Sequence, residues 1–172
     1  MLEGGPGPDD LRTVTFALCR EVAELVEAPV SDEELTEALD SGRARERFVA
    51  WAERQGAESA WLRDPVFDLA PEEHVLSAPR AGRLARVDTR QIGLLLAEAG
   101  GGRRRAGDDI DFGVSLRREA RLGDSMEEGQ ELARVYLRTS DEALADDFAA
   151  CFAIDDHGEA PELIRERIEP SR

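Results

Sequence analysis

Apolar residues recur at helical spacing along the first third of this 172-residue chain. Over residues 11–25 they fall every three or four positions, which predicts a helix that stops before Pro29. The segment "SDEE" follows, in which Ser31 and Glu34 have the three-residue spacing of a capping box. A third amphipathic stretch comes after it. Residues 1–57 are therefore predicted to be helical.

The pattern changes after these helices. Residues 58–73 contain two prolines and little periodicity, and they are predicted to be a linker. Short alternating runs then predict strands at "HVLSAP", "GRLARVD", "GVSLRREA", "QELARVYL" and "ELIRERIEP". Two amphipathic helices lie among them, "DTRQIGLLLAEAG" capped by Asp88 and "SDEALADDFAACFA" capped by Ser140. The predicted fold is α+β, with a helical part followed by a strand-rich domain at 74–170.

Charge and composition limit the possible partners. The chain has 38 acidic and 22 basic residues and a formal net charge of −16, so it repels both nucleic acid and anionic membranes. We therefore expect no nucleic acid and no membrane as partner. No apolar run reaches the length of a membrane span, and the first residues lack the features of a signal peptide, which predicts a cytoplasmic protein. Cys19 and Cys151 fall in apolar helical patterns and are predicted to be buried free thiols.

Every basic residue is arginine, and lysine is absent. Two explanations stay open, codon usage in a GC-rich genome and adaptation to high salt. The absence also has a chemical consequence. The segments "SAPRAGRLARV" and "RLGDSMEEGQELARV" resemble the half-motifs of biotinyl and lipoyl carrier domains, which attach their cofactor to a lysine. A carrier is therefore excluded, while a barrel-sandwich fold remains possible.

One stretch concentrates residues that often bind anions, "GGGRRRAGDDID" from Gly100 to Asp111. Glycines let a backbone approach a ligand closely, and arginines hold phosphate through paired hydrogen bonds. The stretch is not a Walker loop, because it lacks the Lys-Ser/Thr pair and follows a predicted helix. Two interpretations stay open, a tight turn with charged edges and an anion-contacting loop.

Other candidate groups give weaker signals. His74 and His157 lie near neither a serine elbow nor a nucleophilic cysteine, so they are predicted to be surface or structural residues. The segment "DDHGE", residues 155–159, carries possible metal ligands. No second cluster with ligand spacing accompanies it, and a solvated loop is predicted.

The order of segments resembles the C-terminal part of the pyrimidine-nucleoside phosphorylases, the thymidine phosphorylase family. Near the loop, that family's pattern is Leu-Gly-Ala-Gly-Arg followed by Asp-x-Ile-Asp-x-x-Val-Gly. Ala-Gly-Gly replaces Leu-Gly-Ala here, and Phe112 shifts the spacing before the last glycine. The matching residues are Gly102, Arg103, Asp109, Ile110, Asp111 and Gly113. The resembling segments, which cover nearly the whole chain in family order, are "GGPGPDDLRTVTFAL", "ALDSGRARERFVAWAERQGA", "SAPRAGRLARVDTRQIG", "GGGRRRAGDDIDFGVSL" and "LGDSMEEGQELARV".

The resemblance implies a fold and a reaction. Residues 1–57 would end the family's central nucleoside-phosphorylase domain, 58–73 would be a linker, and 74–170 would form its C-terminal α/β hammerhead domain, barrel-sandwich-like and mostly antiparallel. The reaction is pentosyl transfer to phosphate in nucleoside salvage. Phosphate attacks the anomeric carbon of a pyrimidine nucleoside, which gives the free base and a pentose 1-phosphate.

The family binds phosphate and base with residues that include two lysines, in parts that these segments do not include. A lysine-free chain cannot supply those lysines, so the resemblance implies no catalytic or substrate-binding residue here, and the isolated chain is predicted to be inactive. Its expected partner is the N-terminal half of a phosphorylase or a homodimer partner, with phosphate and pyrimidine nucleoside bound only in a complete enzyme. The alternative is a non-enzymatic protein-interaction module that uses a hammerhead β-sandwich.

The resemblance implies two tentative sites. The first is a loop beside the substrate cleft, with Arg103 bracing closure by hydrogen bonding rather than holding the reacting phosphate; its residues are Gly102, Arg103, Asp109 and Asp111. The second is a monovalent cation site for K⁺, formed by the carbonyls of Leu25 and Ala28 and the carboxylate of Glu37. Free carbonyls at a helix end and a carboxylate suit a hard cation. No other cofactor is expected.

Overall fold

A computed structural model describes residues 1–2 and 7–168, and it divides the chain into two compact units. Unit 1 combines Met1–Val66 with Glu162–Arg172, and unit 2 is Phe67–Pro161. The sequence placed its boundaries at residues 57 and 74 and assigned the C-terminal segment to the second domain. The segment groups with unit 1 because Arg167 forms ion pairs with Glu21 and Glu24.

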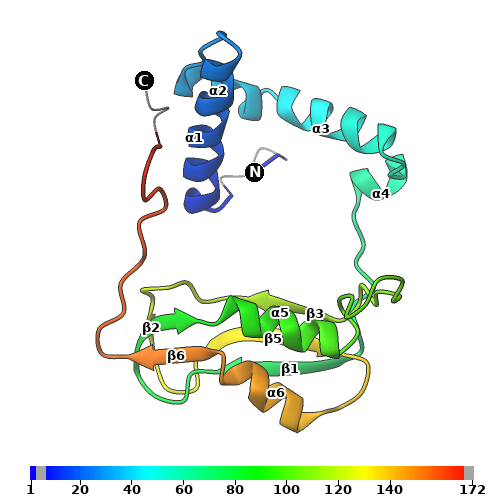
Figure 1. The fold of residues 1–172 in the computed structure, drawn as a ribbon, viewed down its shortest axis with the longest axis vertical. Coiled ribbons are helices and arrows are strands. Elements are labelled where there is room, and N and C mark those ends of the chain that lie inside the picture. Colours follow the sequence, from blue (N-terminus) through cyan, green and yellow to red (C-terminus); the bar gives the residue numbers. More distant parts are fainter. Residues whose placement is uncertain (3–6, 169–172) are drawn as a thin grey trace. The chain divides into compact units, whose positions relative to one another are not determined.

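Unit 1 is helical, as expected (Figure 1). Its helices are α1 (Asp9–Leu25), α2 (Asp32–Asp40), α3 (Arg43–Arg54) and α4 (Ser59–Arg63). The capping box at the start of α2 is confirmed: the Glu34 amide donates to Ser31 Oγ at 3.2 Å, and the Ser31 amide donates to Glu34 Oε2 at 2.9 Å. Helix α4 lies inside the stretch that was expected to be a linker.

Unit 2 contains two three-stranded sheets in which every described pairing is antiparallel. One sheet has the order β1-β5-β3, and the other has the order β4-β2-β6. The strands are β1 (Glu72–Ser77), β2 (Gly82–Val87), β3 (Ser115–Arg118), β4 (Ser125–Met126), β5 (Glu131–Leu137) and β6 (Phe152–Asp155). Helices α5 (Thr89–Glu98) and α6 (Glu142–Ala149) complete the unit. The α+β class is confirmed, and the hammerhead arrangement stays a prediction.

The hydrophobic core of unit 2 joins both sheets to α6. Its fully buried large side chains are Phe148 of α6, Leu84 of β2, and Leu132 and Val135 of β5. Helix α6 packs against β1 and α5 (Figure 1). The core is mainly aliphatic, as the low aromatic content requires. Burial on this scale holds the ends of α5, β3 and β5 in fixed positions, and the candidate loop lies between them.

The structure corrects three local predictions. The segment "ELIRERIEP" contains no strand over its described residues 162–168, and its last two residues lie outside the described part. The second helix of unit 2 ends at Ala149, so Phe152, which lies in the segment predicted to be helical, begins strand β6. The cap of this helix is Asp141 rather than Ser140, since the Asp141 carboxylate accepts a hydrogen bond from the Leu144 amide at 3.0 Å.

Candidate functional site

The glycine–arginine loop, residues 100–113, connects α5 to β3. Gly100 adopts a left-handed φ of 98°, just after the C-cap Ala99. The Gly100 amide donates to the Ala97 carbonyl at 3.3 Å, and the Gly101 amide donates to the Leu96 carbonyl at 2.8 Å. These two bonds form a Schellman motif, which satisfies carbonyls that the helix end leaves free. The first glycine therefore ends the helix.

The next two glycines permit close packing. A Cβ atom on Gly101 would lie 2.7 Å from the carbonyl oxygen of Val114, at the entry to β3. A Cβ on Gly102 would lie 3.2 Å from Ala97 Cβ. Both glycines thus let the loop pass close to neighbouring protein atoms. Their contacts explain the glycines without any ligand.

The arginines of the loop are organised by Asp108. Its carboxylate oxygen Oδ2 accepts hydrogen bonds from the amides of Arg104 and Arg105, at 3.1 and 2.8 Å. Arg103 Nε donates to the Asp108 carbonyl at 3.3 Å. The three arginine side chains are exposed. The geometry is that of a hydrogen-bonded turn with charged edges, the first of the two sequence-based interpretations.

Asp111 links the loop to the end of β5. Arg138, the residue after β5, donates from Nε to Asp111 Oδ2 at 2.6 Å and from Nη2 to Oδ1 at 2.8 Å. The Gly113 amide also donates to Oδ1, at 3.0 Å, and the Asp111 amide donates to the Gly100 carbonyl at 2.9 Å. Paired charge-assisted bonds of this kind fix geometry as well as adding energy. The Arg138 hydrogen bonds lower the pKa of Asp111 from 3.8 to about 2.

Gly113 fills a place that admits no side chain. A Cβ atom there would lie 2.6 Å from Arg138 Nη2 and 2.7 Å from the Asp68 carbonyl oxygen. The Gly113 carbonyl accepts a hydrogen bond from the Ala70 amide at 2.9 Å, so the segment before β1 is held against the end of the loop. The loop is therefore attached at both ends.

The structure places the four predicted loop residues in two groups. Arg103 and Asp111 form hydrogen bonds and Gly102 packs against Ala97, whereas no bond is described for the exposed Asp109; Phe112 nearby is 86% exposed. Their role beside a substrate cleft stays a prediction. Sequence reasoning missed Arg138, which is 27 residues away from its partner. Only the fold brings the two together.

An open hollow of about 410 Å³ lies beside Arg138. Three carboxylates line it, and Arg138 is engaged by Asp111. Carboxylates repel phosphate. The hollow is therefore unsuited to bind phosphate by itself; its lining residues are Glu98, Ala99, Leu137, Arg138, Thr139, Asp141, Ala143, Leu144 and Asp147.

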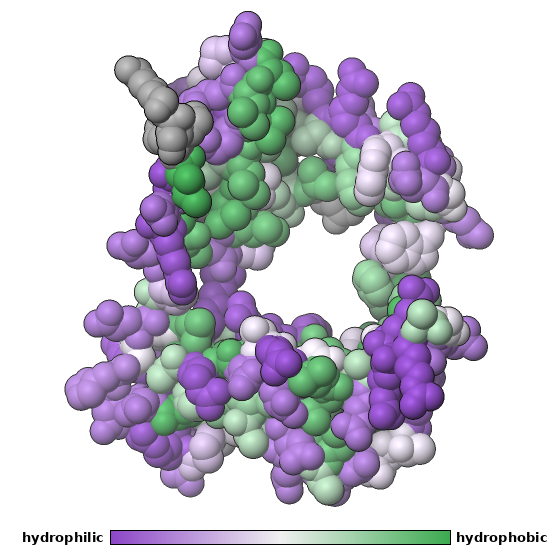
Figure 2. All heavy atoms as spheres, viewed as in Figure 1, coloured by the Kyte–Doolittle hydropathy of each residue, from purple (hydrophilic) through white to green (hydrophobic). Residues whose placement is uncertain are grey.

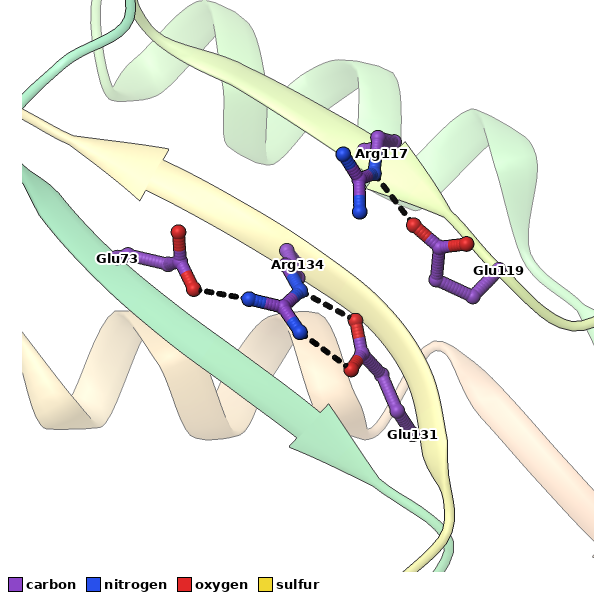
Figure 3. A network of polar contacts seen from close by, with 5 residues as sticks. All are labelled: Glu73, Arg117, Glu119, Glu131 and Arg134. Atoms are coloured by element: carbon purple, nitrogen blue, oxygen red, sulfur yellow. Dashed lines mark hydrogen bonds and ion pairs between the residues drawn. The ribbon is translucent and has the colours of Figure 1, made fainter.

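A second arginine cluster lies on the β1-β5-β3 sheet, and Figure 3 shows its partners. Arg134 forms paired hydrogen bonds with Glu131 and an ion pair with Glu73, while Arg117, opposite it in the register, is bonded to Glu119. The Arg134 hydrogen bonds lower the pKa of Glu131. Arg117 and Arg134 face each other on β3 and β5, and like charges in that position destabilise a sheet. The three glutamates neutralise them, so the cluster does not offer an anion site.

The histidines have structural or exposed positions. The side chain of His74 is only 10% exposed, with Nδ1 3.8 Å from Glu142 Oε1, and His157 is exposed. Arg80 donates to Asp156 of the "DDHGE" segment at 2.9 Å and to the carbonyl of Ile154, just before that segment, at 2.9 Å. No cluster of three or more histidine, cysteine or acidic residues suited to a metal occurs within 1–2 and 7–168. Cys151 is a buried free thiol whose pKa is raised by burial. Cys19 is also free, but it is only partly buried, so the prediction of burial was wrong for this residue.

The residues of the predicted cation site lie at the end of α1 and on α2. Leu25 is the last residue of α1, Ala28 follows in the loop, and Glu37 is exposed on α2 with Arg43 at 3.7 Å. Proline has no amide hydrogen, so Pro29 cannot donate to the Leu25 carbonyl as the next helical turn would. The carbonyl is thus available as a ligand. The site itself stays a prediction.

None of the helices in the described part of the chain combines the length and apolar character needed to cross a membrane.

Comparison with known proteins gives consistent results. The family described as "Pyrimidine nucleoside phosphorylase C-terminal domain" matches residues 83–155, which include the whole glycine–arginine loop. A thymidine phosphorylase of Burkholderia cenocepacia is 35% identical over 178 residues, which cover 98% of this chain and 40% of that protein. One from another strain of the species is 36% identical over 180 residues, and one from Burkholderia orbicola is 35% identical over 178, with the same coverage. The chain thus spans 40% of the length of these relatives. The alternative of a non-enzymatic interaction module is not favoured.

Proposed function

Because this chain belongs to the pyrimidine nucleoside phosphorylase family and corresponds to its C-terminal part, we propose that it completes an active site for nucleoside phosphorolysis. The similarity to thymidine phosphorylases across 98% of the chain carries this proposal. In the reaction, a phosphate oxygen bonds to the anomeric carbon while the glycosidic bond breaks. The bonding electrons pass to the departing nitrogen of the base, so the products are free base and a pentose 1-phosphate.

The contribution of this chain is positional. Phosphorolysis needs no covalent enzyme intermediate, and its rate depends on orienting phosphate and nucleoside and on stabilising an oxocarbenium-like transition state. The Asp111–Arg138 pair fixes the glycine–arginine loop, which borders the substrate cleft in the complete enzyme. Arg103 braces the closed cleft by hydrogen bonding. The protein acts in the cytoplasm.

The residues that hold phosphate belong to an N-terminal phosphorylase part. Residues 1–172 include no lysine, and the hollow beside Arg138 has three carboxylates in its lining. A preparation of residues 1–172 alone should therefore release no thymine from thymidine and phosphate, measured by the change in ultraviolet absorbance. Base release above the buffer rate would contradict this account.

A monovalent cation bound by Leu25, Ala28 and Glu37 would fix the end of α1 against α2. The Leu25 carbonyl lacks the donor that Pro29 removes, and Glu37 supplies charge. We expect KCl to raise the melting temperature more than an equal concentration of tetramethylammonium chloride, by a few degrees, and Glu37→Gln to abolish the difference. Equal melting temperatures in the two salts would argue against the site.

A further inference from the structure

Unit 1 leaves most of its apolar surface uncovered. Within the described residues, its buried side chains are Phe16, Leu39 and Ala52, whereas eighteen residues of unit 2 form a continuous core. Twelve of the seventeen large apolar side chains that are exposed in the described chain belong to unit 1. A unit of this size with so little buried surface is only marginally stable by itself. It therefore requires a further surface to pack against.

Helix α1 presents the most regular part of this surface. Five apolar residues lie along one side of this helix and are called the α1 stripe below: Leu11, Val14, Leu18, Val22 and Leu25. At 100° per residue these positions fall within an arc of about 80°. No acidic or basic residue of α1 falls inside that arc. The exposures of Leu11, Leu18, Val22 and Leu25 are 50%, 61%, 59% and 84%, and Figure 2 shows hydrophobic residues gathered over α1.

The opposite side of α1 packs inside unit 1. Phe16 is 8% exposed and lies roughly 160° from the centre of the α1 stripe. Arg12 covers the Phe16 ring at 4.8 Å and donates to Thr36 of α2 at 2.9 Å. The α1 stripe thus faces away from the side on which α1 packs inside unit 1, and four of its five residues are exposed.

Two possible packing partners for the α1 stripe are disfavoured, the C-terminal segment and a second copy of the chain. The C-terminal segment is attached at the edge of α1 through Arg167 and Glu21, with Nε and Oε1 3.1 Å apart, and it leaves Leu25 84% exposed. A second copy of the chain would bring together two bodies that each carry a net charge of −16, which repel one another.

The relatives suggest a third packing partner, the part of their own chain that this chain does not match. They match this chain over 40% of their length and continue through another 60%, in the same polypeptide as their C-terminal domain. We propose that the N-terminal part of the phosphorylase packs on the α1 stripe, an inference that rests on the function proposed above. The stripe is then the interface through which this chain joins the residues that bind phosphate.

The test is a binding titration between residues 1–172 and the part of the Burkholderia cenocepacia thymidine phosphorylase that this chain does not match. Leu18→Asp places a charge at the middle of the stripe. Leu94→Asp is the matched control, because Leu94 is 51% exposed on α5 of unit 2. Circular dichroism should show the same helix content and melting temperature for both free variants, since neither side chain is buried.

We expect Leu18→Asp to weaken binding at least tenfold and Leu94→Asp to change it less than twofold. Equal binding by Leu18→Asp and wild type, or no binding by wild type, would overturn the inference. So would a wild-type dimer in sedimentation equilibrium that Leu18→Asp dissociates, because the stripe would then belong to a second copy. If Leu18→Asp loses binding while the wild-type mixture binds but releases no base, the interface stands and the proposed function fails.

Discussion

Asp111 is the residue on which the geometry of the glycine–arginine loop depends. Its carboxylate accepts two hydrogen bonds from Arg138 and one from the Gly113 amide. Its pKa is lowered from 3.8 to about 2, so the native state binds this proton more weakly than the unfolded chain does. The pair therefore stabilises the fold fully above pH 3.8, and this contribution is lost as the pH falls toward 2.

Replacing Asp111 by asparagine should lower the melting temperature of unit 2 by a few degrees at pH 7. The difference from wild type should shrink between pH 3.8 and about 2, because the wild-type carboxylate becomes protonated there. Thermal unfolding followed by circular dichroism at several pH values measures the difference in melting temperature between the variant and wild type. Asp109→Asn, at an exposed position of the same loop, is the control and should change little. A difference that does not depend on pH would show that the charge of Asp111 is not what matters.

At the other end of the loop, Gly113 allows the loop backbone to lie close to the backbone of Asp68 and Ala70. An alanine methyl group there would lie 2.7 Å from the Asp68 carbonyl oxygen and 3.0 Å from the Ala70 amide nitrogen, both backbone atoms. Gly113→Ala should therefore destabilise unit 2 by about 1–3 kcal/mol in urea unfolding. Gly93→Ala, where no atom outside the local helix backbone would lie within 4 Å of the new methyl group, should stabilise α5 by about 0.5–1 kcal/mol. If Gly113→Ala left the free energy of unfolding unchanged, the two backbone segments could move apart to admit the methyl group.

At the scale of secondary-structure elements, the start of α6 has two neighbouring residues that could serve as its N-cap, Ser140 and Asp141. The sequence indicated Ser140 as the cap, and the structure shows the Asp141 carboxylate accepting from the Leu144 amide at 3.0 Å. Asp141→Ala should cost about 1 kcal/mol of stability, and Ser140→Ala should cost much less. Urea unfolding of the two variants measures both. The reverse order would restore the assignment made from sequence.

Most elements could be predicted because their signals are local. The capping box of α2, the cap of α5 and the alternation of β1, β2, β3 and β5 all lie within a few residues of sequence. Strand β4 has two residues, too few for a pattern. Strand β6 follows α6 within an unbroken apolar run, and its pairing with β2, some 70 residues earlier, decides its conformation.

The candidate site also contains some residues that could be predicted from the sequence and others that could not. Gly100 and Asp111 could be singled out from the sequence because glycine at a helix end and an acid in a turn are local signals. Arg138 could not, since its distance along the chain carries no information about pairing. The missing strand at residues 162–168 has a similar cause: a local pattern does not show whether a segment will pair, and in the described chain this segment pairs with no strand while Arg167 bonds to α1.

For the molecule as a whole, the two units differ in how self-sufficient they are. Unit 2 has its own core and holds the glycine–arginine loop in a defined geometry. Unit 1 buries three apolar side chains within its described residues and exposes twelve large ones. This imbalance and the absence of lysine agree with the proposal that the chain works in combination with a phosphorylase N-terminal part.

The most direct test of that account is complementation. Residues 1–172 and the unmatched N-terminal part of the Burkholderia cenocepacia thymidine phosphorylase are each assayed alone and then mixed, with thymidine and phosphate as substrates. Thymine release is followed by ultraviolet absorbance. We predict release in the mixture at a rate that neither part reaches alone. A mixture that forms a complex in sedimentation but releases thymine no faster than buffer would contradict the central claim.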